Sequence, residues 1–280
     1  MTRQVSKQIS AIRVVQLFFI LIFGCYFLLC MGMAAFQRSF IYFPKKYSST
    51  QVDQMAREAN LERWTNSAGQ PIGLMRRAPR QPALGSILIA YGNGSTATGS
   101  AHYADDIQNV APFDVFVLEY PGYEDRPGSP SQKSFFEAGT DALNSLPGNR
   151  PIYLVGESLG SGTVSYLAGT FPGRVAGVLL ISPFNRLADV AQYHYPILPV
   201  GLLLVDRFPS EDYLRNYHGK VGITVDGGDD IVPEQFGRRL YDGYDGPKKL
   251  WEFPNAGHCQ ITGAQSVFWT QVIQFWRSPL

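Results

Sequence analysis

The first feature of the hydrophobic pattern is an uninterrupted apolar stretch at residues 17–36, LFFILIFGCYFLLCMGMAAF, which has no charged or amide side chain. As a helix this stretch is about 30 Å long, which matches the hydrocarbon core of a bilayer. Because the stretch has no polar face, it favours a membrane-spanning helix over the core helix of a globular domain. A cleaved signal peptide fits less well, since its apolar core typically has about 7–15 residues.

Beyond residue 61 the pattern changes to short apolar runs that alternate with longer amphipathic stretches. Strands are predicted as a pair around a turn within 62–78 and at 86–90, 113–118, 152–155, 175–182, 221–225 and 249–253. Helices are predicted at 131–146, 159–170, 233–241 and 265–277. Short continuous apolar runs are typical of strands covered on both faces. The alternation therefore predicts an α/β fold with a mainly parallel sheet and helices on both faces, whose ligands bind at the carboxyl ends of the strands.

These two patterns divide the chain into a tail and anchor at 1–36 and one domain at 37–280. Within the domain, 183–219 is too long for a simple connection and is predicted to be an insertion that forms a cap. The apolar residues at 195–205 could line an acyl-chain pocket, dip into a membrane, or form a core helix of the insertion.

The formal net charge of +1 comes from 24 basic and 23 acidic residues, but the two kinds are unevenly distributed. Four of the basic residues precede residue 39, and the first acidic residue is Asp53. The remaining 20 basic and 23 acidic residues give the body a charge of −3. A mildly acidic body has no basic footprint for nucleic acid, so we expect no nucleic-acid partner and a lipid bilayer as the partner of the N-terminal helix.

The orientation of the anchor is weakly determined by its flanking charges. Three basic residues stand on each side of the apolar run: Arg3, Lys7 and Arg13 before it, and Arg38, Lys45 and Lys46 after it. The positive-inside rule therefore gives no clear answer. We favour a single-pass anchor with a cytoplasmic N-terminus and an extracytoplasmic body. Outside the anchor the only cysteine is Cys259, so cysteine usage does not identify the compartment.

The sequence GESLG at 156–160 is the sharpest candidate for chemistry. By itself this pattern is weak, and a glycine-rich turn with an incidental serine is the alternative. Its context is more specific, because it follows the predicted strand at 152–155 and opens the predicted helix at 159–170. Such a strand–turn–helix elbow holds a serine in a strained, exposed turn, which predicts Ser158 as a nucleophile.

A serine hydroxyl needs a base to remove its proton, and the chain has four histidines. In the elbow-type fold the chain order is serine, acid, histidine. His102 precedes Ser158, and His194 and His218 lie in the predicted insertion. His258 follows the last predicted strand in a short glycine-containing loop, so we predict that it is the base.

The acid is expected between the nucleophile and the base, just after a strand. The sequence GGDDIVP at 227–233 satisfies this expectation and offers two adjacent carboxylates. We favour Asp229 as the acid that orients the imidazole and stabilises its protonated form, with Asp230 as the alternative. Asp226 fits less well because it belongs to the strand end.

An acyl-transfer site also requires an oxyanion hole. One donor is expected to be the backbone N–H of Leu159, the residue after the nucleophile. The second is expected in the loop YGNG at 91–94, after the predicted strand at 86–90, where Asn93 is the natural backbone donor. An ordinary Gly/Asn turn is the alternative reading of that loop.

Taken in order, these motifs resemble the α/β-hydrolase superfamily, and more narrowly the membrane-anchored serine hydrolases of the ABHD12, ABHD13 and ABHD17 groups and their bacterial relatives. The matching stretches are QRSFIYFP at 37–44, YGNG at 91–94, EYPGY at 119–123, PGSPS at 127–131, GESLG at 156–160, DDIVP at 229–233 and GH at 257–258. One departure is Tyr91, where relatives usually have histidine. Activity is expected to survive because the neighbouring oxyanion donor is a backbone group, while Tyr91 could reshape the rim of the pocket.

The resemblance implies an α/β-hydrolase fold preceded by one transmembrane helix. It also implies hydrolysis of carboxylic esters or thioesters of small-molecule or acyl substrates, often lipids, through an acyl-enzyme on Ser158. A serine peptidase of similar fold and a catalytically silent scaffold are the alternatives. The sequence has no metal-ligand cluster and no cofactor motif, so we expect neither a metal nor a cofactor. The oligomeric state stays open.

Overall fold

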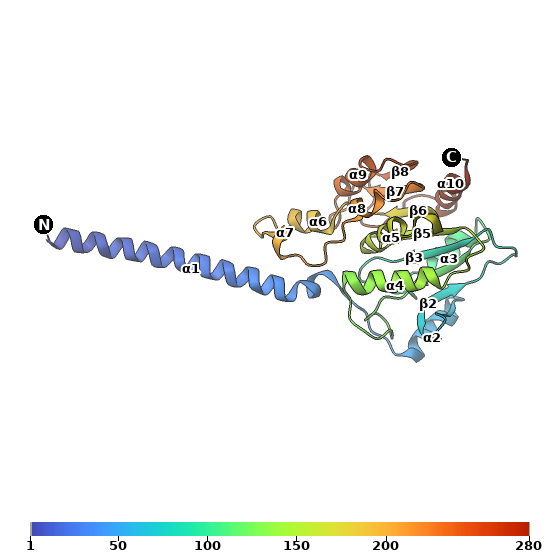
Figure 1. Cartoon of the computed structure of the whole chain (residues 1–280), viewed down its shortest axis with the longest axis horizontal. Helices are drawn as coiled ribbons and strands as arrows, with labels where there is room; N and C mark the ends of the chain where they lie inside the picture. Colours follow the sequence, from blue (N-terminus) through green and yellow to red (C-terminus); the bar gives the residue numbers. More distant parts are fainter. Residues whose placement is uncertain (1, 280) are drawn as a thin grey trace.

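The computed structural model of the chain describes residues 2–279, with side chains at residue 13 and from residue 15 onward. The first element, α1 (Thr2–Ile41), is a long helix that extends away from a body of sheet and helices (Figure 1). Its part Val15–Ile41 is long and apolar enough to cross a membrane. Few of the side chains in this part are buried in the body, as expected for a helix that faces lipid.

Past α1, a short segment leads into α2 (Ser49–Glu58), a helix that the apolar pattern did not reveal. Its start is fixed by a capping box, in which Ser48 accepts from the N–H of Gln51 and the Gln51 side chain accepts from the N–H of Ser48. The helix packs against the first strand of the sheet. Only two of its residues, Val52 and Ala56, are buried, so its hydrophobic signal is short.

The body is built on one eight-stranded sheet with the order β1-β2-β4-β3-β5-β6-β7-β8. The strands are β1 (Glu62–Thr65), β2 (Pro71–Arg76), β3 (Ser86–Ala90), β4 (Asp114–Leu118), β5 (Ile152–Glu157), β6 (Val175–Ile181), β7 (Lys220–Asp226) and β8 (Lys248–Phe253). β2 pairs antiparallel with β1 and β4, and the strands from β4 to β8 pair in parallel. The predicted mainly parallel sheet is confirmed.

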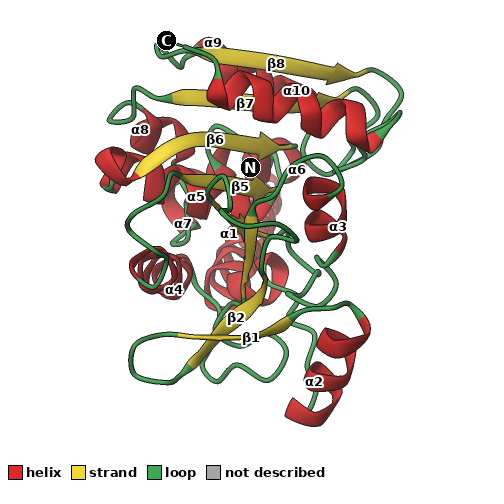
Figure 2. Ribbon diagram, turned by 90° about the vertical axis from the view of Figure 1, so that its right-hand side faces the viewer, coloured by secondary structure: helices red, strands yellow, loops and turns green. Residues whose placement is uncertain are grey.

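Helices cover both faces of this sheet (Figure 2). They are α3 (His102–Gln108), α4 (Gln132–Asn144), α5 (Leu159–Thr170), α9 (Glu234–Asp242) and α10 (Gln265–Arg277), with the short 3-10 turn η1 (Pro172–Arg174) before β6. The helix α10 packs against α3, whereas α5 packs against α4 and the central strands. The helix α3 was not predicted from the sequence, because its seven residues give too short a pattern.

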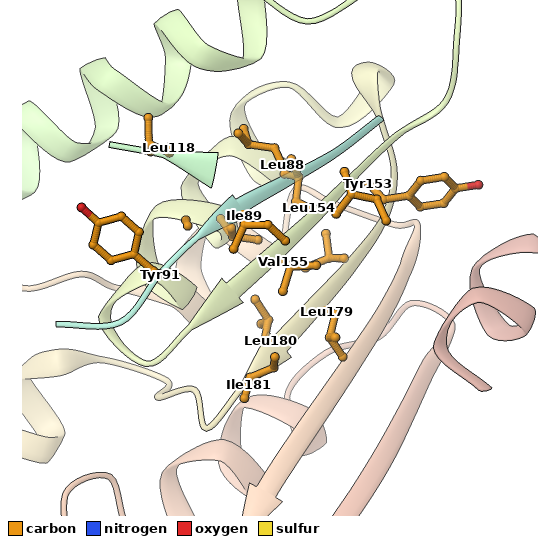
Figure 3. Packing of buried hydrophobic residues seen from close by; sticks show 14 of the residues in the cluster. Leu88, Ile89, Tyr91, Leu118, Tyr153, Leu154, Val155, Leu179, Leu180 and Ile181 are labelled. Carbon is orange, nitrogen blue, oxygen red and sulfur yellow. The ribbon is translucent and has the colours of Figure 1, made fainter. Parts of the chain in front are cut away.

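The central strands explain why short apolar runs in the sequence correctly predict strands (Figure 3). Consecutive residues such as Leu88 and Ile89 in β3, and Leu154 and Val155 in β5, are completely buried. Side chains of consecutive strand residues point to opposite faces, so both faces of the sheet must be covered. The predicted bounds of β3, α5 and α10 match the structure residue for residue.

Between β6 and β7 the chain forms α6 (Leu187–His194), α7 (Val200–Leu203) and α8 (Ser210–Leu214). The helix α8 packs against α5, whereas α6 and α7 pack together and α7 contacts α1 (Figure 1). The predicted insertion at 183–219 therefore corresponds to a segment with two parts. One part belongs to the helical layer on the sheet, and the other part lies beside the anchor helix.

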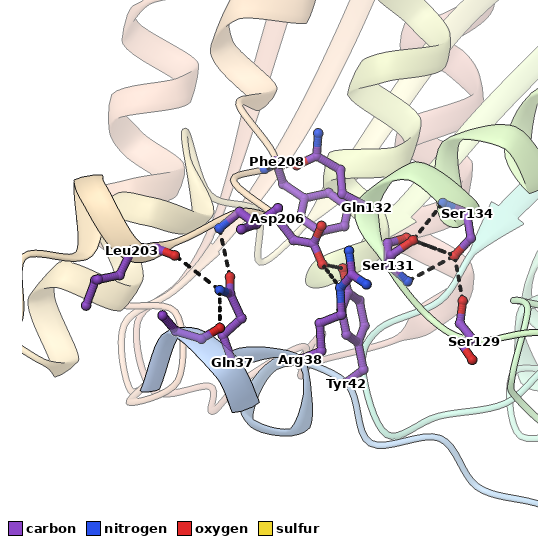
Figure 4. Close-up of polar contacts among 12 residues, drawn as sticks. Gln37, Arg38, Tyr42, Ser129, Ser131, Gln132, Ser134, Leu203, Asp206 and Phe208 are labelled. Carbon is purple, nitrogen blue, oxygen red and sulfur yellow. Dashed lines mark hydrogen bonds and ion pairs between the residues drawn. The ribbon is translucent and has the colours of Figure 1, made fainter. Parts of the chain in front are cut away.

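The last turn of α1 and the residue after it are joined to this segment by polar contacts (Figure 4). Arg38 Nε and the Tyr42 hydroxyl both donate to the same Asp206 carboxylate oxygen, each at 3.0 Å. Gln37 donates to the carbonyl of Leu203 at 3.1 Å and accepts from the N–H of Val205 at 2.7 Å. These contacts fix the direction in which α1 leaves the body.

A buried carboxyl group supports the loop after β3. Tyr91 is completely buried, and its hydroxyl donates to Glu119, which also accepts from the N–H groups of Ala97 and Tyr120. Tyr91 therefore lies in the core below the loop, and the expectation that it reshapes the pocket rim is wrong. Burial, and the neighbouring carboxyl of Glu124, raise the pKa of Glu119 well above its usual range.

We predict that Glu119→Gln flattens the pH dependence of stability. Because the pKa of Glu119 is raised on folding, the folded state holds its proton above pH 4.5, where the unfolded chain releases it. The free energy of unfolding of the native protein then falls by about 1.4 kcal/mol for each pH unit between the unfolded-state and folded-state pKa of Glu119. Glu119→Gln has no ionisable group at this position, so this fall is absent from the variant. Urea unfolding of both proteins in detergent at pH 5 and pH 8 measures the difference. Equal losses for the two proteins would contradict the prediction.

Candidate active site

Ser158 lies in a sharp turn between β5 and α5, at the carboxyl end of a central strand. Its φ of 48° is in the left-handed region, which is strained for a residue with a side chain, and its N–H is held by the carbonyl of Ile181 at 2.8 Å. A Cβ added at Gly160 would lie 2.0 Å from the carbonyl oxygen of Ala90. The glycine therefore permits α5 to approach β3 closely enough to form the turn.

The predicted nucleophile, base and acid lie in one hydrogen-bonded row, although the first and second are 100 residues apart in sequence. His258 Nε2 is 2.8 Å from Ser158 Oγ, and His258 Nδ1 is 2.6 Å from Asp229 Oδ2. Ser158 follows β5, Asp229 follows β7 and His258 follows β8. The carboxyl ends of these parallel strands meet at the same edge of the sheet. With Nδ1–H donated to the carboxylate, Nε2 is free to accept the serine proton.

The two candidate acids differ sharply in their surroundings. The Asp229 side chain is 1% exposed, and its second oxygen accepts from the N–H groups of Ile231 and Val232 at 2.9 and 2.8 Å. Asp230 is exposed and lines the neighbouring cavity. The geometry therefore brings Asp229, and not Asp230, to His258.

The loop after β7 carries Asp229 and is called the acid loop here, and the loop after β8 carries His258 and is called the histidine loop. The two loops are packed backbone to backbone. The N–H of Gly227 donates to Phe253 at 3.0 Å, and the N–H of Gly228 donates to Ala256 at 2.9 Å. A Cβ added at Gly227 would lie 2.4 Å from the carbonyl oxygen of Pro254. The two glycines therefore set the separation of the loops that carry Asp229 and His258.

Ser182 is a further positioning residue that the sequence did not reveal. Its hydroxyl donates to Asp226 and accepts from the N–H of Cys259 at 2.9 Å, directly beside His258. Asp226 is thus used to hold the histidine loop, and burial raises its pKa. A single serine at the end of a strand has no sequence signal that would assign it this role.

Both predicted oxyanion donors border the same cavity as Ser158. Leu159 is the first residue of α5, where backbone N–H groups have no partner within the helix. The Asn93 side chain donates to the carbonyl of Ile41 and accepts from the N–H of Phe43 at 3.0 Å and the Tyr123 hydroxyl at 2.8 Å. The loop that carries the second predicted donor is therefore held by the end of α1.

A cavity of about 560 Å³ leads away from Ser158. Its walls come from α1, from the segment 184–204 and from the acid loop, and they are mostly apolar. Their side chains include those of Met33, Phe40, Ile41, Phe184, Leu187, Leu198, Leu203 and Ile231. Polar residues, among them His194 and Asp230, also line it, and His194 Nε2 lies 2.9 Å from the carbonyl of Ile231. The sequence pattern does not indicate this contribution of α1, because its apolar run predicts only a membrane-spanning helix.

Comparison with known proteins agrees with this architecture. The family model of the alpha/beta hydrolase fold matches residues 86–208. An uncharacterized protein of Mycobacterium tuberculosis is 33% identical over 178 residues, which are 62% of this chain and 62% of that protein. The lysophosphatidylserine lipase ABHD12 of Danio rerio is 29% identical over 183 residues, which are 56% of this chain and 46% of that protein. This chain thus spans less than two thirds of the length of these relatives.

Solved structures extend the likeness to nearly the whole body. An esterase of Pyrococcus furiosus superposes with a TM-score of 0.61 at 12% sequence identity, covering 84% of this chain and 97% of that chain. At such low identity the likeness concerns the fold. The resemblance noted from the motifs is confirmed, and the chain has the α/β-hydrolase fold, with esterases and lipases among the proteins that it is similar to.

Proposed function

We propose that the protein is a serine hydrolase that cleaves carboxylic ester or thioester bonds of lipid-like or acylated substrates. The observation that carries the proposal is the hydrogen-bonded row of Ser158, His258 and Asp229 beside an apolar cavity. A catalytically silent scaffold does not require these three side chains to be hydrogen-bonded to one another at 2.6 and 2.8 Å.

In the proposed reaction, Ser158 Oγ attacks the substrate carbonyl carbon while His258 Nε2 takes the hydroxyl proton. Asp229 stabilises the resulting imidazolium, and the N–H groups of Asn93 and Leu159 stabilise the oxyanion. Collapse of the intermediate breaks the ester or thioester bond, and His258 returns the proton to the departing alcohol or thiol. Water then attacks the acyl-serine by the same route, which releases the acid and restores the hydroxyl.

The preference for an acyl chain is supported by the walls of the cavity. An apolar lining favours transfer of methylene groups from water at about 0.8 kcal/mol for each buried group. The ABHD12 relative of Danio rerio is a lysophosphatidylserine lipase by name, which points to the same class of substrate.

The place of the reaction is proposed from α1, which would anchor the body directly beside a bilayer. For orientation we retain a cytoplasmic N-terminus and an extracytoplasmic body. Paired fluorescent-protein and phosphatase reporters fused after residue 280 distinguish this orientation from the reverse.

The nucleophile is tested by labelling with a fluorophosphonate probe, which reacts with activated serines. We expect the native protein to be labelled and Ser158→Ala to be unlabelled, because no other serine is activated by His258 in the proposed site. Ser165→Ala removes another serine of α5 and is the matched control, expected to label like the native protein. Equal labelling of native protein and Ser158→Ala would reject the nucleophile. No labelling of any folded variant would favour the scaffold alternative.

The choice between the two carboxylates makes a second prediction. Asp229→Asn should lower kcat for a p-nitrophenyl ester by about 10³–10⁴-fold, since the imidazole loses the group that orients it and stabilises its charge. Asp230→Asn should change kcat by less than about threefold, because Asp230 is exposed at the cavity and does not contact His258. A larger loss in Asp230→Asn would reverse the assignment.

Substrate preference is tested with p-nitrophenyl esters of rising chain length. We expect kcat/KM to increase from acetate to octanoate or beyond, by up to about fourfold for each methylene that enters the cavity. The same series on Ser158→Ala corrects for spontaneous hydrolysis. A preference for acetate over octanoate would count against a lipid-like substrate.

A further inference from the structure

The connection between β6 and β7 reaches far along the anchor helix. The hydroxyl of Tyr26, in the middle of the apolar run of α1, donates to the carbonyl of Ile197 at 2.8 Å. Cys30, four residues further along, is buried in a cluster with Leu198, Val200 and Leu204. We name residues 195–205 the cap tip, because they form the part of the cap that lies against α1.

The length of α1 sets where the cap tip lies relative to a bilayer. The apolar span starts at Val15, so only residues 15–25 precede the contact at Tyr26. Eleven helical residues are about 16 Å long, which is close to half of the roughly 30 Å of a hydrocarbon core. If α1 crosses the membrane, the hydrocarbon must also surround the part of α1 to which the cap tip is bound.

The surface of the cap tip fits such surroundings. The segment has no charged side chain, and its apolar residues Ile197, Leu202 and Val205 are 73%, 85% and 67% exposed. In water this exposure leaves large apolar side chains uncovered, whereas in hydrocarbon it is favourable. The cap tip lies directly against α1, whose apolar side chains are exposed as well, so bilayer lipid is the occupant that covers both.

The backbone of the cap tip is also prepared for a medium without water. Polar backbone groups in hydrocarbon need partners within the protein. Besides Tyr26, Gln37 of α1 pairs with the carbonyl of Leu203 and the N–H of Val205. Arg207 lies just outside the cap tip and donates to the carbonyl of Gly201 at 2.8 Å. Side chains of α1 and of Arg207 thus supply hydrogen-bond partners for backbone groups of the cap tip outside the short helix α7 and at its ends.

The cavity that begins at Ser158 extends to this region. Met33, inside the apolar run of α1, lines the cavity together with Leu198 and Leu203 of the cap tip. We propose that the cap tip inserts into the bilayer beside α1, so that the cavity opens into the hydrocarbon. A membrane-resident ester then reaches Ser158 by lateral movement of its acyl chain, a consequence that rests on the proposed hydrolase function.

Insertion itself is tested by tryptophan fluorescence, independently of catalysis. The full chain is reconstituted into phosphatidylcholine vesicles with or without bromine atoms on the acyl chains, which quench tryptophan on contact. The four native tryptophans are at most 8% exposed and lie in the body, so their emission is a stable background. We expect the added emission of Leu202→Trp to be mostly quenched by the brominated lipid. Val267→Trp, at an exposed apolar position of α10 that does not line the cavity, is the matched control expected to be unaffected.

If the emission of Leu202→Trp is no more quenched than that of Val267→Trp, the cap tip does not enter the hydrocarbon and the proposal is overturned. This result holds whether or not the protein is a hydrolase.

Lateral access is tested with two substrates. For Leu202→Asp we expect at least a tenfold loss in hydrolysis of p-nitrophenyl palmitate embedded in phosphatidylcholine vesicles, because a carboxylate disfavours insertion. Hydrolysis of soluble p-nitrophenyl butyrate should stay at the native rate, since Leu202 does not line the cavity, and this also reports correct folding. Val267→Asp should affect neither substrate.

Native rates for Leu202→Asp on both substrates would overturn lateral access. Failure of the native protein to cleave either ester would reject the hydrolase function, while leaving the fluorescence test of insertion valid. A loss on both substrates in Leu202→Asp alone would mean that the variant is misfolded, and the quenching of Leu202→Trp then decides the question.

Discussion

The arrangement of α1, the segment between β6 and β7, and the cavity depends on one interaction, the pairing of the buried Asp206 carboxylate with Arg38 and Tyr42. Asp206 is 3% exposed, and its carboxylate is shared by these two residues at the end of α1. A buried charge is costly unless it is paired and hydrogen-bonded, so this contact resists separation of the helix from the body. Because it fixes α1, it also fixes Met33 and Phe40 as walls of the cavity. The helix that is long and apolar enough to cross a membrane is therefore also a wall of the cavity beside Ser158.

Much of the fold could be predicted because parallel strands covered on both faces appear in the sequence as short apolar runs, as β3 and β5 illustrate. The row of Ser158, His258 and an acid could be proposed because the fold constrains their order along the chain. The choice between Asp229 and Asp230 could not be derived with equal force, since two adjacent carboxylates have the same sequence signal. Only the turn, in which two backbone N–H groups meet Asp229, separates them.

Contacts between segments that are distant along the chain could not be predicted from the sequence. The Asn93 side chain joins the loop after β3 to the last carbonyl of α1, 52 residues away. Ser182 holds the loop of His258 across 77 residues. Periodicity and motif spacing report only on neighbours within one element or loop, so neither contact leaves a trace in them. Both contacts position backbone next to the proposed chemistry, which makes the site depend on the packing of α1 and β6.

The exposed polar residues His194 and Asp230 line the same cavity as Met33 of the apolar run. For a substrate of the proposed kind, this combination of polar and apolar lining separates the two products by their solubility. A released fatty acid stays in the lipid phase, and the more polar alcohol leaves toward water. Since each product partitions into a different phase, their re-encounter in the cavity becomes rare, so reversal of the proposed cleavage within the cavity is disfavoured.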